Sequence, residues 1–203
     1  MGISRANGAL ALVHDAIRLG RLVVTGLRMA ELGNQSLRKD VLGIQVPAKK
    51  FFTAMGMEHT SIDQNGKDGA LPLDLCLPIT RPDLLESFDL VTNFGTIEHV
   101  DRQYPAWRNV HSLAKVGGLF LHLLPETGSW PGHCPYRYGP EFPAALARCC
   151  AYEVLQCSRG EINPDHRFST AILRKTKSDF PAEEVFSSAV TIDSPLAGKR
   201  ARP

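Results

Sequence analysis

The 203-residue sequence has no marked excess of one charge, few cysteines and no long hydrophobic run. Its 23 Lys and Arg side chains nearly balance 21 Asp and Glu, which leaves a formal net charge of +2. So small an excess gives no strong attraction to a nucleic acid or an anionic membrane. The apolar run at residues 9–13 ends at His14, too short for a secretory signal or a membrane span. We therefore expect a soluble, cytoplasmic protein with neither a nucleic-acid nor a membrane partner.

Cysteine is scarce, and its spacing excludes the usual frameworks. No pair has the Cys-x-x-Cys spacing of a zinc knuckle, and the count is odd. A chain of this length can build a hydrophobic core without disulfides, so we expect free thiols in a reducing compartment. A metal site, for example one built on His133, Cys134 or Cys149, is not expected. The five cysteines are Cys76, Cys134, Cys149, Cys150 and Cys157.

Apolar strands alternate with amphipathic helices along most of the chain. This alternation predicts an α/β fold, with a mostly parallel sheet covered by helices on both faces. We expect one domain over residues 1–175, beginning with a lead helix at 9–22, and a partly ordered polar tail at 176–203. The expected strands are 26–33, 58–63, 71–78 (interrupted by two prolines), 88–93, 119–124, 152–157 and 168–173. The other expected helices are 47–55, 105–115 and 140–149.

Unusual polar residues follow the predicted strands, at the points where the strands end. In an open α/β sheet, ligands bind beyond the carboxyl ends of the strands. The sequence therefore predicts a ligand site at that edge of the sheet. The segments are 31–35, 63–66, 74–75, 93–99 and 125–138.

The order of these segments resembles the class I (Rossmann-like) S-adenosylmethionine-dependent methyltransferases, particularly the small bacterial ubiquinone-biosynthesis-like (type 11) group. Glu31-Leu-Gly33-Asn34-Gln35 stands where the family has its acidic glycine loop after the first strand. The fourth-strand segment 88–100 and the glycine turn and fifth strand at 113–121 are similar to the family's most specific pieces. The resemblance implies a seven-stranded methyltransferase fold, S-adenosyl-L-methionine as cofactor and a transferase activity.

The resemblance also implies roles for particular residues. Gly33 lets the backbone approach the cofactor, and Asp63 accepts hydrogen bonds from the ribose hydroxyls. Asp74 accepts from the adenine amino group, and Glu31 holds the ammonium of the methionine part. The predicted cofactor-binding residues are Glu31, Gly33, Asn34, Asp63, Asp74, Leu75 and Asn93.

The glycine loop departs from the family pattern. Gln35 stands where the family has its second glycine, and the following segment, 36–46, is long enough to form a flap over the cofactor. A catalytically inactive, methyltransferase-like binding or interaction module is therefore the alternative function. A nicotinamide dehydrogenase is disfavoured, because the loop lacks Gly-x-Gly-x-x-Gly.

Two histidines are candidates for the catalytic base. His99 follows Glu98 beyond the fourth strand, and His133 lies in the aromatic loop after the fifth. We expect His122 to be a core residue and His111 to lie at a helix surface.

The same aromatic loop is the predicted acceptor wall, with Trp130, Tyr136 and Arg137 as substrate-contacting residues. Asn93 is followed by Phe94-Gly95, not by the Pro-Pro-Tyr of amide-methylating enzymes, which favours a small-molecule acceptor. The acceptor atom (oxygen, nitrogen or carbon) and the oligomeric state stay open.

Overall fold

A six-stranded sheet forms the centre of the molecule, which we describe from a computed structural model over residues 2–194. Four neighbouring strands, β4, β1, β5 and β6, are parallel, whereas β9 and β8 run antiparallel to their neighbours. In spatial order the strands are β4 (Glu58–Ile62), β1 (Arg28–Leu32), β5 (Phe88–Phe94), β6 (Ala114–Pro125), β9 (Arg167–Arg174) and β8 (Glu153–Glu161).

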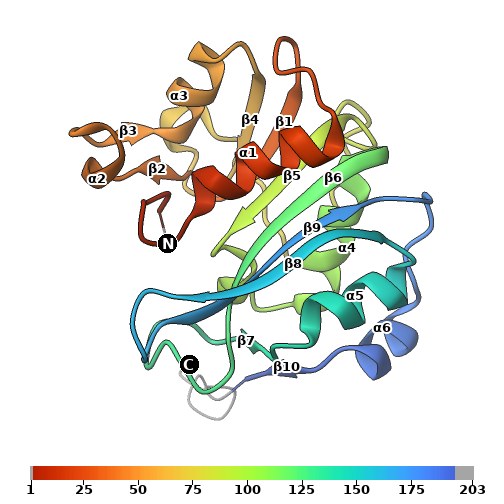
Figure 1. The fold of residues 1–203 in the computed structure, drawn as a ribbon. Coiled ribbons are helices and arrows are strands. Elements are labelled where there is room, and N and C mark those ends of the chain that lie inside the picture. Colours follow the sequence, from red (N-terminus) through yellow and green to blue (C-terminus); the bar gives the residue numbers. More distant parts are fainter. Residues whose placement is uncertain (1, 195–203) are drawn as a thin grey trace.

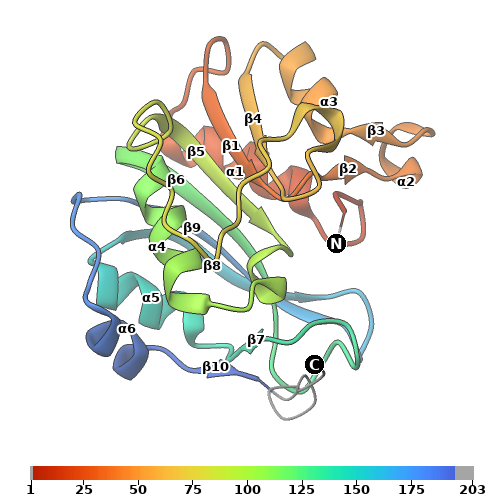
Figure 2. The ribbon, with the colours of Figure 1, turned by 180° about the vertical axis from the view of Figure 1, so that it is seen from behind.

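Helices cover both faces of this sheet (Figures 1 and 2). Side chains alternate along each strand: Leu90 and Phe94 of β5 enter one core, and Val91 enters the other. The predicted α/β architecture, a mostly parallel sheet covered by helices on both faces, is therefore confirmed. The first core packs against α1 (Ala9–Gly20) and α3 (Ala48–Ala54), and the second against α4 (Gln103–Leu113), α5 (Phe142–Cys150) and α6 (Glu183–Ala189).

The predicted strand at 71–78 is not formed, so the sheet has six strands and not seven. A single bridge joins Leu71 to Ile62. Proline has no N–H for a sheet ladder, and Pro72 and Pro78 stand in this segment. Instead, the Asn109 side chain of α4 accepts from the N–H of residue 79 (2.9 Å) and donates to the carbonyls of residues 75 and 77 (3.0 and 2.8 Å).

The predictions for His122 and His111, which lie in the second core, differ in their outcome. His122 is buried as predicted, and burial lowers its pKa to about 3. The prediction of a surface position for His111 is wrong, because its ring lies against Tyr152 (Nδ1–OH 2.8 Å) and the Ser178 carbonyl (Nε2–O 2.8 Å). Burial lowers the pKa of His111 to about 4.

Part of the segment predicted as a polar tail, 176–203, folds onto the body of the molecule. Helix α6 inserts the buried Phe186 into the core, and β10 (Ile192–Asp193) pairs with β7 (Arg137–Tyr138). Residues 195–203 lie outside the described part of the chain. The remaining short elements are η1 (Lys67–Gly69), η2 (Ile97–His99), α2 (Lys39–Leu42), β2 (Ser36–Leu37) and β3 (Val46–Pro47).

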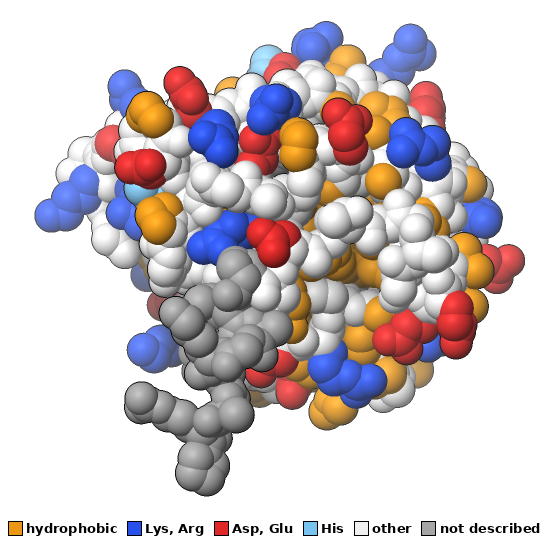
Figure 3. All heavy atoms as spheres, turned by 90° about the horizontal axis from the view of Figure 1, so that it is seen from below, with side chains coloured by type: hydrophobic (Ala, Val, Ile, Leu, Met, Phe, Trp, Pro, Cys, Tyr) orange, Lys and Arg blue, Asp and Glu red, His pale blue; other side chains and the backbone are white. Residues whose placement is uncertain are grey.

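Charges are mixed on the surface seen in Figure 3, where basic side chains lie among acidic ones. Among residues 2–194, no helix is both long enough and apolar enough to cross a membrane.

Candidate functional site

A cleft of about 420 Å³ opens at the carboxyl ends of β1, β4 and β5. Its volume lies within the range of small-molecule sites. Segments that are far apart in the sequence meet there, as expected for an open α/β sheet. The structure brings five of the seven predicted cofactor residues into its wall, together with the candidate base His99. These five are Gly33, Asn34, Asp63, Asp74 and Leu75.

The glycine loop has little room for a side chain at position 33. Gly33 has a φ of 79°, and a Cβ there would lie 2.5 Å from Oγ1 of Thr96. The Thr96 hydroxyl donates to the Leu32 carbonyl (2.7 Å) and accepts from the Gln35 amide (3.2 Å). Gln35, which replaces the family's second glycine, thus ties the loop to the segment after β5 while it also lines the cleft.

The two cleft aspartates organise their own loops. Asp63 accepts the N–H of Asn34 through Oδ2 (2.8 Å) and the N–H of Asn65 through Oδ1 (2.9 Å). Asp74 accepts the N–H of Cys76 (2.8 Å). A carboxylate oxygen accepts more than one hydrogen bond, so both groups can brace the loops and also receive a ligand hydroxyl or amino group.

The electrostatics of the cleft favour a cationic ligand. Its described lining residues include three aspartates, Asp63, Asp74 and Asp101, and neither Lys nor Arg. The chain also passes from the glycine loop into β2 and not directly into a helix. The helix N-terminus on which a dinucleotide pyrophosphate would rest is therefore missing after β1.

Two predicted cofactor residues, Glu31 and Asn93, lie behind the cleft and not in its wall. Oε2 of Glu31 accepts from the Ser61 hydroxyl and the Gln35 N–H, each at 3.3 Å. Oδ1 of Asn93 accepts the N–H groups of residues 96 and 97, each at 3.2 Å. In this arrangement both side chains shape the two loops that line the cleft.

The segment 36–46, predicted to be a flap, does not line the cleft. It forms a small hairpin in which β2 pairs with β3. The hairpin is anchored to the start of the chain: the N–H of Ile3 donates to the Ser36 carbonyl (3.0 Å), and the N–H of Arg38 donates to the Ile3 carbonyl (2.8 Å).

The predicted acceptor residues brace the loop after β6 and do not line the cleft. The buried Trp130 donates from its indole N–H to the Arg167 carbonyl (2.6 Å). Arg137 donates to the Trp130 carbonyl (2.5 Å), and Tyr136 donates from its hydroxyl to the Asp101 carbonyl (2.7 Å). Because Asp101 belongs to the cleft wall, Tyr136 fastens this loop beside the cleft.

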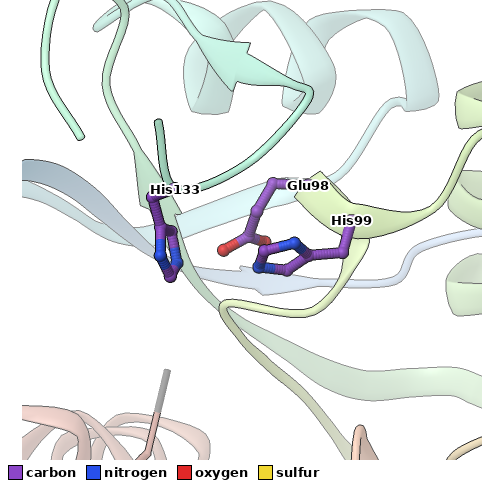
Figure 4. A group of neighbouring side chains, drawn as sticks. All are labelled: Glu98, His99 and His133. Carbon is purple, nitrogen blue, oxygen red and sulfur yellow. The ribbon is translucent and has the colours of Figure 1, made fainter. Parts of the chain in front are cut away.

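The two candidate bases meet across a third residue that the sequence analysis did not assign to the site. The ring centroids of His99 and His133 are 5.1 Å apart, and the Glu98 carboxyl group points between the two rings (Figure 4). Burial raises the pKa of Glu98 to about 7 and lowers that of His133. The adjacent Glu98 and His99 could be read from the sequence. Their proximity to His133 could not, because it depends on the conformation of the loop after β6.

Neither a protein-family model nor a curated protein matches this sequence. Solved structures do match the fold. One is the Burkholderia thailandensis 1,6-didemethyltoxoflavin-N1-methyltransferase with 1,6-didemethyltoxoflavin and S-adenosylhomocysteine bound: TM-score 0.56, 14% identity, 82% of this chain and 79% of that chain.

Two further matching structures are a cyclase and a second N-methyltransferase, so proteins that share this fold differ in the reactions they catalyse. The [4+2]-cyclase SpnF matches with a TM-score of 0.54 and 13% identity, over 80% of each chain. Haemonchus contortus phosphoethanolamine N-methyltransferase 2, solved with phosphomonomethylethanolamine and S-adenosylhomocysteine, matches with a TM-score of 0.53 and 14% identity. This match covers 83% of our chain and 53% of that one. At such identities the likeness shows the Rossmann-like methyltransferase fold.

Proposed function

We propose that this protein is an S-adenosylmethionine-dependent methyltransferase acting on a small-molecule acceptor. The observation that carries the proposal is the cleft itself. It gathers Gly33, Asp63 and Asp74 from three separate loops at the carboxyl edge of the sheet. One structural neighbour was solved with S-adenosyl-L-methionine, and others with its demethylated product S-adenosylhomocysteine. The cofactor carries a sulfonium and an ammonium, and both cations suit a wall of aspartates without basic residues.

The residues present fit the cofactor in three places. Asp63 faces the cleft at the end of β4, where its carboxylate can accept from both ribose hydroxyls. Asp74 and the backbone of Leu75 stand where an adenine edge would be recognised. The close backbone turn at Gly33 and Asn34 would receive the methionine part. When bound, the cofactor supplies an activated methyl group for in-line transfer.

The acceptor would approach from the side of His99. This ring lines the cleft, and the loop carrying His133 closes beside it. Transfer from a sulfonium depends mainly on holding donor and acceptor aligned in a site from which water is excluded. The fixed loop, fastened by Tyr136 and Trp130, lies beside the cleft and would form the wall of an acceptor site there.

Calorimetry with S-adenosylhomocysteine tests the proposal without knowledge of the acceptor. We expect binding by the full chain, and a roughly ten- to hundredfold loss in Asp63→Ala, because charged hydrogen bonds contribute about 1.5–3 kcal/mol. Asp179→Ala, at an exposed position outside the cleft, is the matched control. Absence of binding to folded protein at millimolar ligand would overturn the proposal, and binding without methyl transfer to any acceptor would favour the inactive module.

A further inference from the structure

Within residues 2–194, no side chain compensates for the burial of the Glu98 carboxyl group. The residue is 0% exposed, and within residues 2–194 neither of its oxygens has a hydrogen-bond partner or an ion-pair partner. Burying a charged or polar group without a partner costs several kcal/mol, and buried polar groups in native proteins are almost always satisfied. A partner of opposite charge at this point would remove the cost.

The groups beside Glu98 are metal ligands. One donor atom each from Glu98, His99 and His133 lies within 4.8 Å of the other two. Ligands bound at about 2.0–2.2 Å to one ion lie roughly 3–3.5 Å apart, so small side-chain rotations suffice to close the site. Figure 4 shows the carboxyl group of Glu98 directed into the space between the two rings.

The backbone around the cluster is already organised. The N–H of Tyr136 donates to the Glu98 carbonyl (3.2 Å), which joins the loop after β6 to η2. The His133 ring packs against Trp130 at a centroid distance of 5.1 Å, and Trp130 is held in turn by the Arg167 carbonyl. Such outer contacts fix ligand orientation and contribute strongly to metal affinity.

We propose that Glu98, His99 and His133 form a binding site for one divalent transition-metal ion. Two imidazoles and a carboxylate suit Zn²⁺ or Fe²⁺ better than Mg²⁺, which prefers oxygen ligands. Three protein ligands leave coordination positions open. Because His99 also lines the cleft, the ion stands at the acceptor side of the cleft wall.

The role of the ion rests on the proposed methyltransferase function. An ion at this wall would hold an acceptor oxygen and lower the pKa of its hydroxyl, so that the proton would pass to solvent. The oxygen would then form the bond to the methyl carbon as the S–C bond breaks and S-adenosylhomocysteine leaves as a neutral thioether. The acceptor is therefore an alcohol or phenol with its hydroxyl directed at the metal. The sequence alone predicted no metal site, because the third ligand is remote from the Glu-His pair.

Zinc titration of untagged, chelator-treated full chain tests the site, and needs no cofactor. We expect one Zn²⁺ per chain with about micromolar or tighter affinity, and a loss of at least roughly tenfold in His99→Ala, His133→Ala and Glu98→Gln. His133 is exposed on a loop, so its replacement leaves the core intact. His14→Ala, on the exposed side of α1, is the matched control and should bind as the parent does.

Two outcomes overturn the site: no Zn²⁺ binding to the folded chain, or binding that survives His133→Ala within about twofold, as binding by cysteines would. Failure of S-adenosylhomocysteine to bind would instead overturn the methyltransferase proposal and leave the metal site standing. With Co²⁺ in the site, acetohydroxamate, an oxygen chelator, should change the visible spectrum. An unchanged spectrum would contradict open positions and hence the acceptor role.

Discussion

Two buried glutamates stand at the two ends of the loop that follows β6, and the fold treats them in opposite ways. Glu126, where the loop begins, accepts two hydrogen bonds from Arg159 (2.7 and 2.6 Å) and one from Ser169 (2.8 Å). Glu98, to which the far end of the loop is joined, has no such partner among residues 2–194. The hydrogen bonds from Arg159 lower the pKa of Glu126, whereas burial raises that of Glu98 to about 7.

The difference separates a structural end of the loop from a functional one. A carboxylate satisfied on every side, such as Glu126, holds the loop against β8 and β9. A buried carboxyl group without partners costs stability, and such groups concentrate where a protein binds or reacts with something. The contrast therefore assigns a structural role to Glu126 and marks Glu98, with His99 and His133, as the functional group.

Exchanging each glutamate for glutamine gives the largest expected effect. Glu126→Gln should lower the free energy of unfolding by about 1.5–3 kcal/mol, because it removes charge-assisted hydrogen bonds from Arg159. Glu98→Gln in metal-free protein at neutral pH should not lower the free energy of unfolding and should raise it, because an uncharged amide replaces a buried carboxyl group whose ionised form costs stability. Urea unfolding measures both values, and equal losses in the two variants would contradict the contrast.

The pH dependence of the same measurement checks Glu126 separately. Its folded pKa lies below its ordinary value, so its contribution is present above the unfolded pKa and is lost as the pH falls through the folded value. The parent should therefore lose stability below about pH 4.5 more steeply than Glu126→Gln does.

His122 sharpens the comparison, because it is buried but is not among the residues that line the cleft. Its folded pKa of about 3 lies below the ordinary 6.5, so the unfolded chain binds the proton first and stability falls as the pH drops below 6.5. His122→Phe, between the rings of Trp107 and Phe120, should reduce this slope by about 1.4 kcal/mol per pH unit near pH 5. His14→Phe, at an exposed position, should leave the slope unchanged.

A smaller effect is expected at Gly33 in the cleft wall, which has the same φ of 79° as Gly43, a glycine outside the cleft. An alanine Cβ at Gly33 would meet Oγ1 of Thr96 at 2.5 Å and Nε2 of Gln35 at 2.9 Å, whereas at Gly43 nothing lies within 4 Å. Gly43→Ala measures the cost of the left-handed backbone alone, about 1 kcal/mol. Gly33→Ala should lower the free energy of unfolding, measured in urea, by about 1 kcal/mol more than Gly43→Ala does. It should also weaken the binding of S-adenosylhomocysteine, measured by calorimetry. Equal losses of unfolding free energy in the two variants would show that the Thr96 and Gln35 side chains move aside, and would contradict a closely packed glycine loop.

Much of the fold was predictable because the signals are local. The apolar strands near residues 28–32 and 88–94 carry their own pattern and end at polar residues, whereas the strand at 58–62 is marked by the turn residues 64–66 that follow it. The strand at 71–78 failed because its prolines remove ladder donors, and Asn109, far along the chain, supplies the replacement bonds. The burial of His111 depends on residues near Ser178, in a segment with no periodic pattern.

The site was predictable to the extent that strand order alone determines it. Gly33, Asp63 and Asp74 follow strand ends, and parallel pairing brings them into one cleft. Glu31 and Asn93 also lie near strand ends, but the sequence does not say which side chains turn inward to brace a loop.

The measurement that tests the central claim most directly is a crystal structure of the chain saturated with S-adenosylhomocysteine. The account predicts density in the cleft, with the ribose hydroxyls on Asp63, the adenine beside Asp74 and Leu75, and the sulfur directed toward His99. A ligand bound elsewhere, or an empty cleft at saturating concentration, would contradict it.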